Sequence, residues 1–299
     1  MIELRFPLVP LAALAALLLG SCGGDDLFED EYPPNLLAVG YADGTFVAVG
    51  ENYSIANSSD GYDFYEQASN GEGSLRGITF GKDVWVAVGE DGVVVTSTDT
   101  ANWFVQYLPT YRTLRGAAFG NNAFVIVGDD GVLLRSGNAG SWSFEESTTN
   151  GDLIDVAFGA NRFVAVGEGG VLLTSPGGID WTHRDSGTTV DLRAVTFGEG
   201  RFVAVGLNGV ILESDDGVDW TPLATATTEN LRDVVIAEGV VVAVGGGGTI
   251  LASKDGAPFV ERASDTSHDL EGVAHGEGTF VAVGRSTEIL NSNDGLNWF

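Results

Sequence analysis

One run of apolar and glycine residues recurs along the chain at a fixed spacing. The run "RFVAVGLNGVILES" at 201–214 closely matches "RFVAVGEGGVLLTS" at 162–175. The glycine that closes this Val-Gly pair falls every 39 residues, at Gly50, Gly89, Gly128, Gly167, Gly206, Gly245 and Gly284. The leucine that opens each copy keeps the same step, at Leu36, Leu75, Leu114, Leu153, Leu192, Leu231 and Leu270. Seven copies without an insertion or deletion indicate one structural unit repeated seven times.

Each copy contains four stretches with the alternation typical of strands. In the fifth copy we expect strands at 192–197, 201–205 and 210–214, and a fourth that opens at Trp220. The turns "GEG", "GLNG" and "DDGVD" separate them. Four short antiparallel strands in a unit of this length match one blade of a β-propeller, whereas a solenoid favours a shorter period and capped ends. The sequence therefore predicts an all-β, seven-bladed β-propeller of four-stranded blades.

The two chain ends fit together in the register of the repeat. The chain stops at Phe299, just after Trp298 opens the fourth strand of the seventh blade, and residues 27–299 hold seven repeats of 39 residues. We therefore expect residues 27–35 to supply the rest of that outer strand and to cover an open sheet edge. Leu27 and Phe28 favour this docking. The alternative is a loose tether and a three-stranded last blade, which the acidic residues and Pro33-Pro34 favour.

The N-terminus has the pattern of an export signal. The apolar run 6–19 is too short to span a bilayer comfortably and is typical of a secretory signal. The end of this run, Leu19-Gly20-Ser21-Cys22, resembles the bacterial lipobox, which implies lipidation of Cys22. We expect a signal peptide at 1–21, a lipidated tether at 22–26 and one propeller at 27–299, anchored to a bacterial membrane on its periplasmic or surface side. The alternative is that Cys22 lies by chance near an ordinary cleavage site.

The charge limits the partners that such a chain can take. The formal net charge is −28, which repels nucleic acid phosphates and anionic lipid surfaces. The acidic residues are spread along the chain and not grouped as metal ligands. Cys22 is the only cysteine, so it can form neither an intrachain disulfide nor a Cys-x-x-Cys metal site. We expect a monomer without metal or cofactor, which contacts a membrane only through its N-terminal lipid.

A second signature marks the turn between the third and fourth strands of each copy. It begins with a serine, at Ser58, Ser97, Ser136, Ser175, Ser214, Ser253 and Ser292. Two residues later comes an aspartate in five copies, at Asp60, Asp99, Asp216, Asp255 and Asp294, with Asn138 and Gly177 in the other two. An aromatic residue closes the unit, at Phe64, Trp103, Trp142, Trp181, Trp220, Phe259 and Trp298. We expect the aspartate to accept turn N–H groups and the ring to pack under the hairpin.

This signature resembles the Asp-box, or bacterial neuraminidase repeat, of β-propellers. Over residues 36–299 the blades look most like the photosystem II assembly/stability factor-like propellers. The spacing here is one residue shorter than the usual Asp-box, and four copies keep both aspartate and glycine. In such propellers the box is a structural turn far from the working face. The resemblance therefore implies a folding role for these aspartates, with calcium binding as the second interpretation.

Four arginines are the candidate binding residues. Arg76, Arg115, Arg193 and Arg232 each follow the leucine that opens an innermost strand, where the other copies have Leu37, Ile154 and Glu271. In a closed ring they lie around the mouth of the central channel and can bind a carboxylate or a C-terminal peptide. The resemblance implies an arginine patch of this kind that binds a partner. The alternative is a structural belt of ion pairs with acidic residues of the nearby turns.

The repeat argues for binding over catalysis. His183, His268 and His275 form no pair with metal-ligand spacing, and His275 stands where other copies have a core phenylalanine. No blade breaks the repeat to bring catalytic groups together. We predict a non-catalytic, envelope-anchored scaffold that binds a protein partner, with the arginines facing away from the membrane. The alternatives are a lectin-like propeller that binds glycans through its repeated tryptophans and a sialidase-type glycoside hydrolase.

Overall fold

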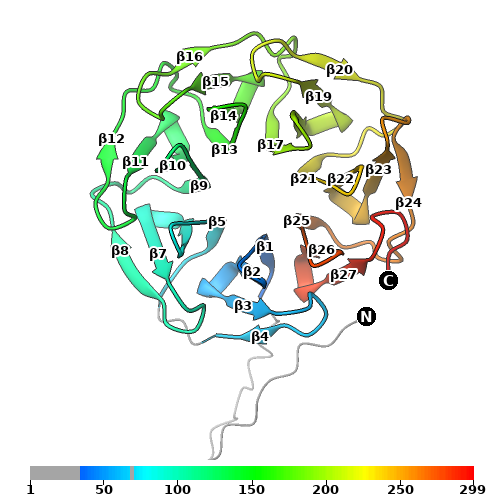
Figure 1. Cartoon of the computed structure of the whole chain (residues 1–299), viewed down its shortest axis with the longest axis horizontal. Coiled ribbons are helices and arrows are strands. Elements are labelled where there is room, and N and C mark those ends of the chain that lie inside the picture. Colours follow the sequence, from blue (N-terminus) through cyan, green and yellow to red (C-terminus); the bar gives the residue numbers. More distant parts are fainter. Residues whose placement is uncertain (1–33, 68–70) are drawn as a thin grey trace, which may run out of the picture.

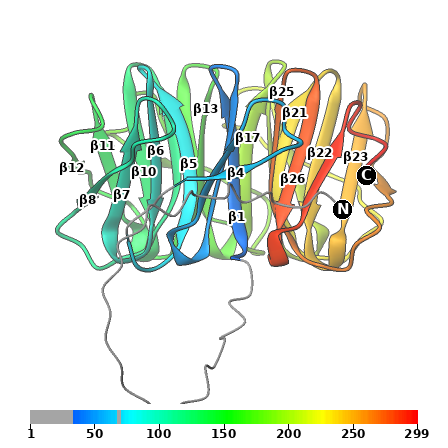
Figure 2. The same cartoon turned by 90° about the horizontal axis from the view of Figure 1, so that it is seen from below.

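The computed structural model describes residues 34–67 and 71–299, which form a ring of seven antiparallel sheets around a central channel (Figure 1). Within each sheet the strands are hydrogen-bonded in chain order, as in β1-β2-β3-β4 of the first blade. Seen side on, the strands cross the thickness of the ring from one face to the other (Figure 2). The predicted seven-bladed β-propeller is confirmed.

The two inner strands of every blade are long. The innermost are β1 (Leu36–Ala42), β5 (Leu75–Gly81), β9 (Leu114–Gly120), β13 (Leu153–Gly159), β17 (Leu192–Gly198), β21 (Leu231–Ala237) and β25 (Leu270–Gly276). The second strands are β2 (Thr45–Gly50), β6 (Val84–Gly89), β10 (Ala123–Gly128), β14 (Arg162–Gly167), β18 (Arg201–Gly206), β22 (Val240–Gly245) and β26 (Thr279–Gly284). The second strands are apolar on both faces because each is covered by the sheets of two neighbouring blades.

The outer half of each blade is shorter. The third strands are β3 (Ile55–Ser58), β7 (Val93–Ser97), β11 (Leu133–Ser136), β15 (Leu172–Ser175), β19 (Ile211–Ser214), β23 (Ile250–Lys254) and β27 (Ile289–Ser292). The outer strands are β4 (Tyr65–Glu66), β8 (Phe104–Tyr107), β12 (Ser143–Phe144), β16 (Thr182–His183), β20 (Thr221–Leu223) and β24 (Val260–Arg262). In the fifth blade these bounds agree with the predicted strands to within one or two residues.

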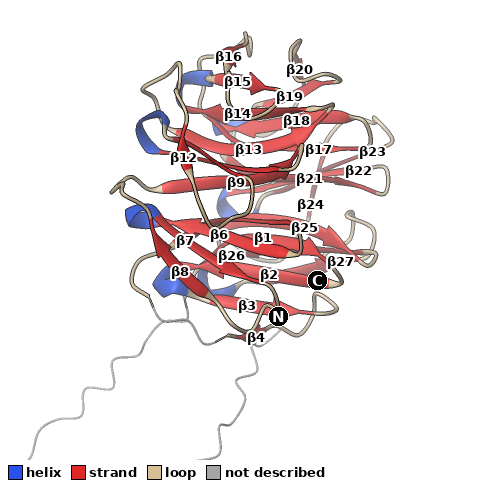
Figure 3. Cartoon of the chain, turned by 60° about the vertical axis from the view of Figure 1, so that its left-hand side comes forward, coloured by secondary structure: helices blue, strands red, loops and turns tan. Residues whose placement is uncertain are grey.

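A single 3-10 turn joins the second strand to the third in every blade. These turns are η1 (Glu51–Tyr53), η2 (Glu90–Gly92), η3 (Asp129–Gly131), η4 (Glu168–Gly170), η5 (Leu207–Gly209), η6 (Gly246–Gly248) and η7 (Arg285–Thr287). They gather on one face of the ring (Figure 3). In η5 the N–H of Leu207 donates to the carbonyl of Asp191 at 3.0 Å, so the turn lies beside the connector that enters the innermost strand. We call the end of the channel at this face the channel mouth.

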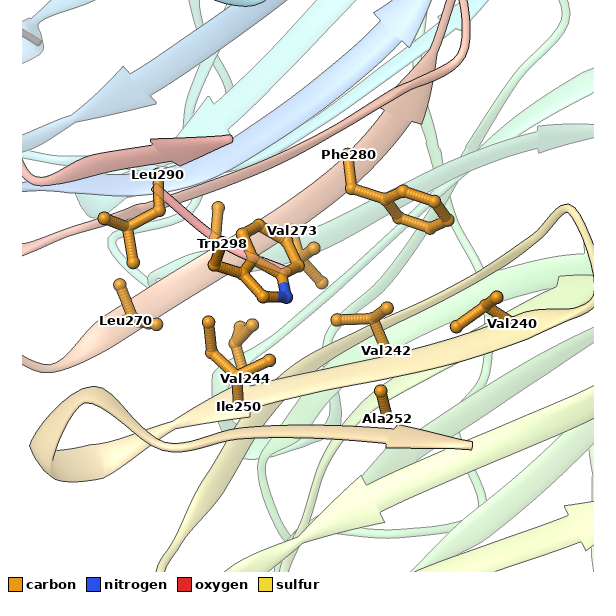
Figure 4. Close-up of a cluster of buried hydrophobic side chains, with 11 residues drawn as sticks. Val240, Val242, Val244, Ile250, Ala252, Leu270, Val273, Phe280, Leu290 and Trp298 are labelled. Carbon is orange, nitrogen blue, oxygen red and sulfur yellow. The ribbon is translucent and has the colours of Figure 1, made fainter. Parts of the chain in front are cut away.

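The hydrophobic core lies between blades. One cluster joins Val242, Val244 and Ile250 of the sixth blade to Phe280 and Trp298 of the seventh (Figure 4). Every other cluster likewise combines side chains of two adjacent blades. A single blade therefore buries its apolar faces only against its neighbours, which explains why the repeat requires a closed ring.

Glycines at the ends of the innermost strands let neighbouring blades approach. A Cβ atom on Gly120 would lie 1.9 Å from the Cγ atom of Phe158 in the next blade. The same arrangement closes the ring, because a Cβ atom on Gly276 would lie 2.2 Å from the Cγ atom of Tyr41. Each ring of this kind also packs on an aromatic residue of its own second strand, as Phe158 does on Phe163 at 4.8 Å between centroids.

The first and last blades are joined by side chains. The amide of Asn291 donates to the carbonyl of Gly61 at 2.5 Å, and the hydroxyl of Tyr62 donates to Asn293 at 2.8 Å. Asn35, at the start of the described chain, accepts the N–H of Ser286 at 2.8 Å. The ring is therefore closed within the described residues.

The N-terminal predictions fall mostly outside the described residues. Within residues 34–67 and 71–299 the last blade has three strands, β25-β26-β27, and Phe299 exchanges backbone hydrogen bonds with Asn291 as the start of a fourth. The signal peptide, lipidated Cys22 and most of the strand predicted at 27–35 lie outside the described residues. Of that strand, Pro34 and Asn35 are described, and neither is in a strand: Asn35 contacts Glu51 of η1 and Ser286 of η7. In the described part of the chain we find no helix with the length and apolar character needed to cross a membrane.

Candidate functional site: the channel mouth

The central channel encloses a cavity of about 730 Å³, lined by all seven innermost strands. Arg76, Arg115, Arg193 and Arg232 line it, at the second position of β5, β9, β17 and β21. The first position, a leucine, is fully buried, and the strand is irregular just beyond it, for example between Leu192 and Ala194. The arginine side chains therefore lie at the channel mouth, outside the packed core, as predicted.

Each of the four arginines has an acidic partner, so the ion-pair belt that the sequence offered as an alternative is present. Arg76 pairs with Glu90 at 2.7 Å, and this guanidinium holds the pKa of Glu90 below its ordinary value. Arg115 pairs with Asp129, and with Asp152 at 3.4 Å. These acids occupy two register positions: the first residue of the turn, 14 residues after the arginine, and the residue before the next innermost strand, 37 residues after it.

Arg232 belongs to a closed cluster of charges. Its guanidinium contacts Asp269 and Glu271, each at 2.6 Å. Arg285 of η7 approaches the same two carboxylates, at 3.5 Å and 3.2 Å. Hydrogen bonding to Glu271 is the main reason that the pKa of Arg285 is raised. Two arginines and two carboxylates thus satisfy one another at the junction of the sixth and seventh blades.

Arg193 is the exception in the belt. The two register positions that hold acids beside the other arginines are Leu207 and Asn230 in its blade, and both line the cavity. Its ion pair in the described structure is with Asp191 at 3.2 Å, through one terminal nitrogen, and its buried Nε atom, like those of Arg76 and Arg232, has no hydrogen-bond partner there. The closest ion pair of each of the other three arginines is shorter, so Arg193 is the least closely paired guanidinium of the four.

Two partly exposed carboxyl groups lie in the channel wall just below the arginines and line the cavity. Asp155 of β13 accepts the N–H of Val195 in the next blade at 2.9 Å, and Asp233 of β21 accepts the N–H of Val273 at 2.8 Å. Burial raises the pKa of Asp155 to about 8, against the opposing hydrogen bond from Val195, and the charge of Asp233 raises it further. Burial likewise raises the pKa of Asp233 to about 7, against the hydrogen bond from Val273.

The opposite end of the channel is aromatic. Tyr41, Phe119, Phe158, Phe197 and His275 line the cavity there, each at the sixth position of its strand. The His275 ring packs on Phe280 at 4.4 Å between centroids, which agrees with its predicted place among core phenylalanines. His183 and His268 are exposed.

The serine and aspartate of the second signature act within their own turns. The hydroxyl of Ser97 accepts the N–H of Thr100 at 2.9 Å. The side-chain amide of Asn102, together with backbone N–H groups, lowers the pKa of Asp99 to about 2. Trp103 packs against the hydrophobic cluster of the first two blades and donates its indole N–H to the carbonyl of Thr100 at 3.0 Å. These contacts match the structural role that the sequence indicated. In residues 34–67 and 71–299, no three His, Cys, Asp or Glu side chains are grouped so as to hold a metal ion.

The sequence analysis missed four residues that shape the site: Leu207, Asn230, Asp155 and Asp233. Three of them share a signal, which is a departure from the repeat at a fixed register. Leu207 stands where four blades have an acid, and Asp155 and Asp233 stand where the other five have glycine or alanine. Alignment of the seven copies by register would have found these three, but not Asn230, because the first blade has Asn35 at the same position.

Comparison with known proteins supports the fold. No family model matches the chain, and no curated protein matches its sequence. A structure described as "YCF48 bound to D1 peptide" is 20% identical, with a TM-score of 0.69 over 87% of this chain and 94% of that one. Virginiamycin B lyase from Staphylococcus aureus, in a catalytically inactive form with quinupristin, is 14% identical, with a TM-score of 0.79 over 87% of this chain and 95% of that one. The WD40 propeller of Doa1 is 12% identical, with a TM-score of 0.67 over 87% of this chain and 93% of that one.

Proposed function

We propose that this protein is a non-catalytic scaffold of the cell envelope that binds a carboxylate-bearing segment of a partner protein at the channel mouth. The observation that carries the proposal is the environment of Arg193. The repeat places an acid beside each of the other three channel arginines, but Leu207 and Asn230 stand at those positions here. A guanidinium with free donors beside an apolar side chain suits a carboxylate attached to an apolar group, such as a peptide C-terminus.

The comparisons support a peptide as the class of ligand. One similar propeller, YCF48, has been solved with a D1 peptide bound. The photosystem II assembly/stability factor-like propellers are also the family that the blade sequences resemble. The sequence identity between this chain and YCF48 is 20%, so the proposed ligand rests on the arginines of this chain and not on the D1 peptide.

The enzyme alternative lacks a suitable arrangement of side chains in the described cavity. A sialidase-type site needs an arginine cluster next to a tyrosine nucleophile with a glutamate partner. Tyr41 does donate to Glu277 at 2.9 Å. However, Tyr41 stands at the sixth position of its strand and the arginines at the second, which is about 13 Å along an extended strand. Burial and the bond to Glu277 raise the pKa of Tyr41, which disfavours the phenolate.

The test compares capture of a partner by matched arginine variants. The wild-type protein and its Arg193→Glu variant are used to capture cross-linked partners from native membranes. C-terminal peptides of the captured protein are then synthesised with a free or an amidated C-terminus, and their affinity for the wild-type protein is measured. The control is Arg201→Glu, because Arg201 pairs with Glu213 at 3.2 Å and does not line the channel.

Loss of one captured species with Arg193→Glu but not with Arg201→Glu, together with weaker binding of the amidated peptide, supports the proposal. Equal capture by all three proteins would contradict a binding site at the channel mouth. Hydrolysis of a fluorogenic sialoside by the wild type would favour the enzyme.

The envelope location rests on the lipobox-like Leu19-Gly20-Ser21-Cys22. A Cys22→Ser variant is expected to leave the membrane fraction and to lose incorporation of radiolabelled palmitate. Retention of both would contradict lipid anchoring at this residue.

Glycan binding is the second candidate, and one observation favours it. Phe104 and Tyr107 on β8 are each 67% exposed, and Tyr111 in the following connector is 93% exposed. Exposed aromatic rings can stack on sugar faces. A glycan array probed with the wild type and with a Phe104→Ala/Tyr107→Ala variant tests this candidate, and absence of any aromatic-dependent signal would exclude it.

A further inference from the structure

The third position of the innermost strand has a special environment. A side chain there points at the backbone of the next blade: a Cβ atom on Gly77 would lie 2.5 Å from the carbonyl oxygen of Arg115. Five blades accordingly have glycine or alanine at this position. They are Ala38, Gly77, Gly116, Ala194 and Gly272. The other two blades have Asp155 and Asp233, which bond to the N–H groups of Val195 and Val273.

These two hydrogen bonds reach strand segments that bear the charges of the mouth. Val195 lies two residues after Arg193 on β17, and Val273 lies two residues after Glu271 on β25. Asp233 itself directly follows Arg232. Both aspartates line the same cavity as the arginines. A negative charge on either aspartate therefore repels an anion bound at the arginines.

The neighbouring strands carry further charged or titratable groups that line the same cavity. Next to the strand of Asp155 they are Arg115 on β9 and Arg193 on β17, and the charge of Asp233, two blades away, contributes to the raised pKa of Asp155. On and beside the strand of Asp233 they are Arg193 on β17, Arg232 on β21, and Glu271 and His275 on β25. His275 is the imidazole of this set, so its contribution is tested separately below.

We propose that Asp155 and Asp233 make anion binding at the channel mouth pH-dependent: the mouth holds a carboxylate tightly while they are protonated and weakly once both are ionised. This inference rests on the proposed function, because it concerns the same site. As neutral acids the two groups leave the field of the arginines unopposed. As carboxylates they add two negative charges one or two residues below the guanidinium groups and repel the ligand.

Two further points support this assignment. Burial places the pKa values of Asp155 and Asp233 at about 8 and about 7, so both groups change charge between pH 6 and 9. By linkage, a ligand anion must raise both pKa values and take up protons on binding near neutral pH. Glu90, by contrast, pairs with Arg76, and this contact lowers the pKa of Glu90.

The experiment uses hexanoate as the probe, because its carboxylate stays ionised above pH 6 and its tail can lie beside Leu207. Binding to the full chain is followed by NMR at pH 6 and pH 9. For the wild type we expect a Kd about tenfold higher at pH 9. The double variant Asp155→Asn/Asp233→Asn keeps an oxygen acceptor for each N–H group, so we expect it to fold and to show the same Kd at both pH values.

Three controls separate the outcomes. Asp155→Ala/Asp233→Ala introduces the residue that the first and fifth blades have at this position. If the asparagine variant fails to fold, the alanine variant replaces it, and we expect the alanine variant to show the same Kd at both pH values. His275→Phe introduces the residue that four other blades have at this position and should keep the pH dependence. Arg193→Glu should bind poorly at both pH values.

A wild-type Kd that is equal at pH 6 and pH 9 overturns this inference and leaves the proposed function intact. A pH dependence that disappears in His275→Phe but persists in the asparagine variant also overturns it. Hexanoate binding that is undetectable at both pH values, or unaffected by Arg193→Glu, counts instead against the proposed function.

Discussion

Arg193 and Arg232 stand at the same position of adjacent blades, yet their surroundings differ. Arg232 contacts two carboxylates at 2.6 Å and shares them with Arg285. Arg193 has one contact, to Asp191 at 3.2 Å, and neighbours Leu207 and Asn230 where acids stand in other blades. The backbone is the same in both blades, so the neighbouring side chains decide how closely each guanidinium is paired with carboxylates.

The largest expected effect is on stability. Arg232→Ala leaves Asp269 and the largely buried Glu271 with Arg285 as their remaining partner, and we expect unfolding free energy to fall by about 2 kcal/mol. Arg193→Ala removes one half-exposed ion pair, and we expect a loss below about 1 kcal/mol. Urea unfolding of both variants measures the difference. Equal losses would show that the two arginines are equivalent.

The next effect is on binding. The variant Leu207→Asp/Asn230→Asp restores acids at both register positions beside Arg193, and we expect its affinity for hexanoate to fall about tenfold because the new carboxylates occupy the guanidinium. The control Leu207→Asn/Asn230→Gln changes the same side chains without adding charge and should keep most of the affinity. Unchanged affinity in the acidic variant would mean that the ligand does not use Arg193.

The same comparison shows how far the sequence could lead. The constant step between Gly50 and Gly284 predicted the blade count, the strands and the ring, because each blade is stable only against its neighbours. It also predicted that the four arginines lie at the channel mouth, because residues at the same position of the repeat lie at the same level along the channel axis. The contacts of Arg115 with Asp152 and of Arg232 with Asp269 could not be found from one blade alone, because these acids reach the arginines from the following blade.

The two channel aspartates show a second limit of prediction from the sequence. Asp155 and Asp233 read as ordinary polar residues of a strand, and their importance depends on the enclosure of the channel by all seven blades. Their raised pKa values follow from that enclosure and not from any local motif. The proposed closing strand at 27–35 stays a prediction, supported by the open outer edge of β27 beyond Phe299 in the described residues.

A third effect is the pH dependence of stability, which differs between Asp155 and Asp233. A carboxyl whose pKa is higher in the folded chain than in the unfolded chain, where it is about 3.9, stabilises the fold fully at low pH and loses this contribution as pH rises through the folded value. The wild type should therefore lose stability relative to Asp155→Asn from about pH 4 up to about pH 8, and relative to Asp233→Asn up to about pH 7. Unfolding free energies measured from pH 4 to pH 9 test the sign and the order. A difference that stays constant with pH would contradict the raised pKa values.

The smallest expected effect comes from removing the one carboxylate beside Arg193. Asp191 has two contacts: one oxygen bonds to Arg193, and the other accepts the N–H of Gly169 at 2.9 Å. In Asp191→Asn the amide oxygen can still accept from Gly169, so stability should change by less than about 1 kcal/mol. The guanidinium loses its internal competitor, and hexanoate affinity should rise about two- to threefold. The equivalent change Asp269→Asn beside Arg232 should give no such gain, because Glu271 still holds that arginine at 2.6 Å. A rise in affinity in both variants would show that the two arginines compete equally for the ligand, and the distinction between a structural and a binding arginine would fail.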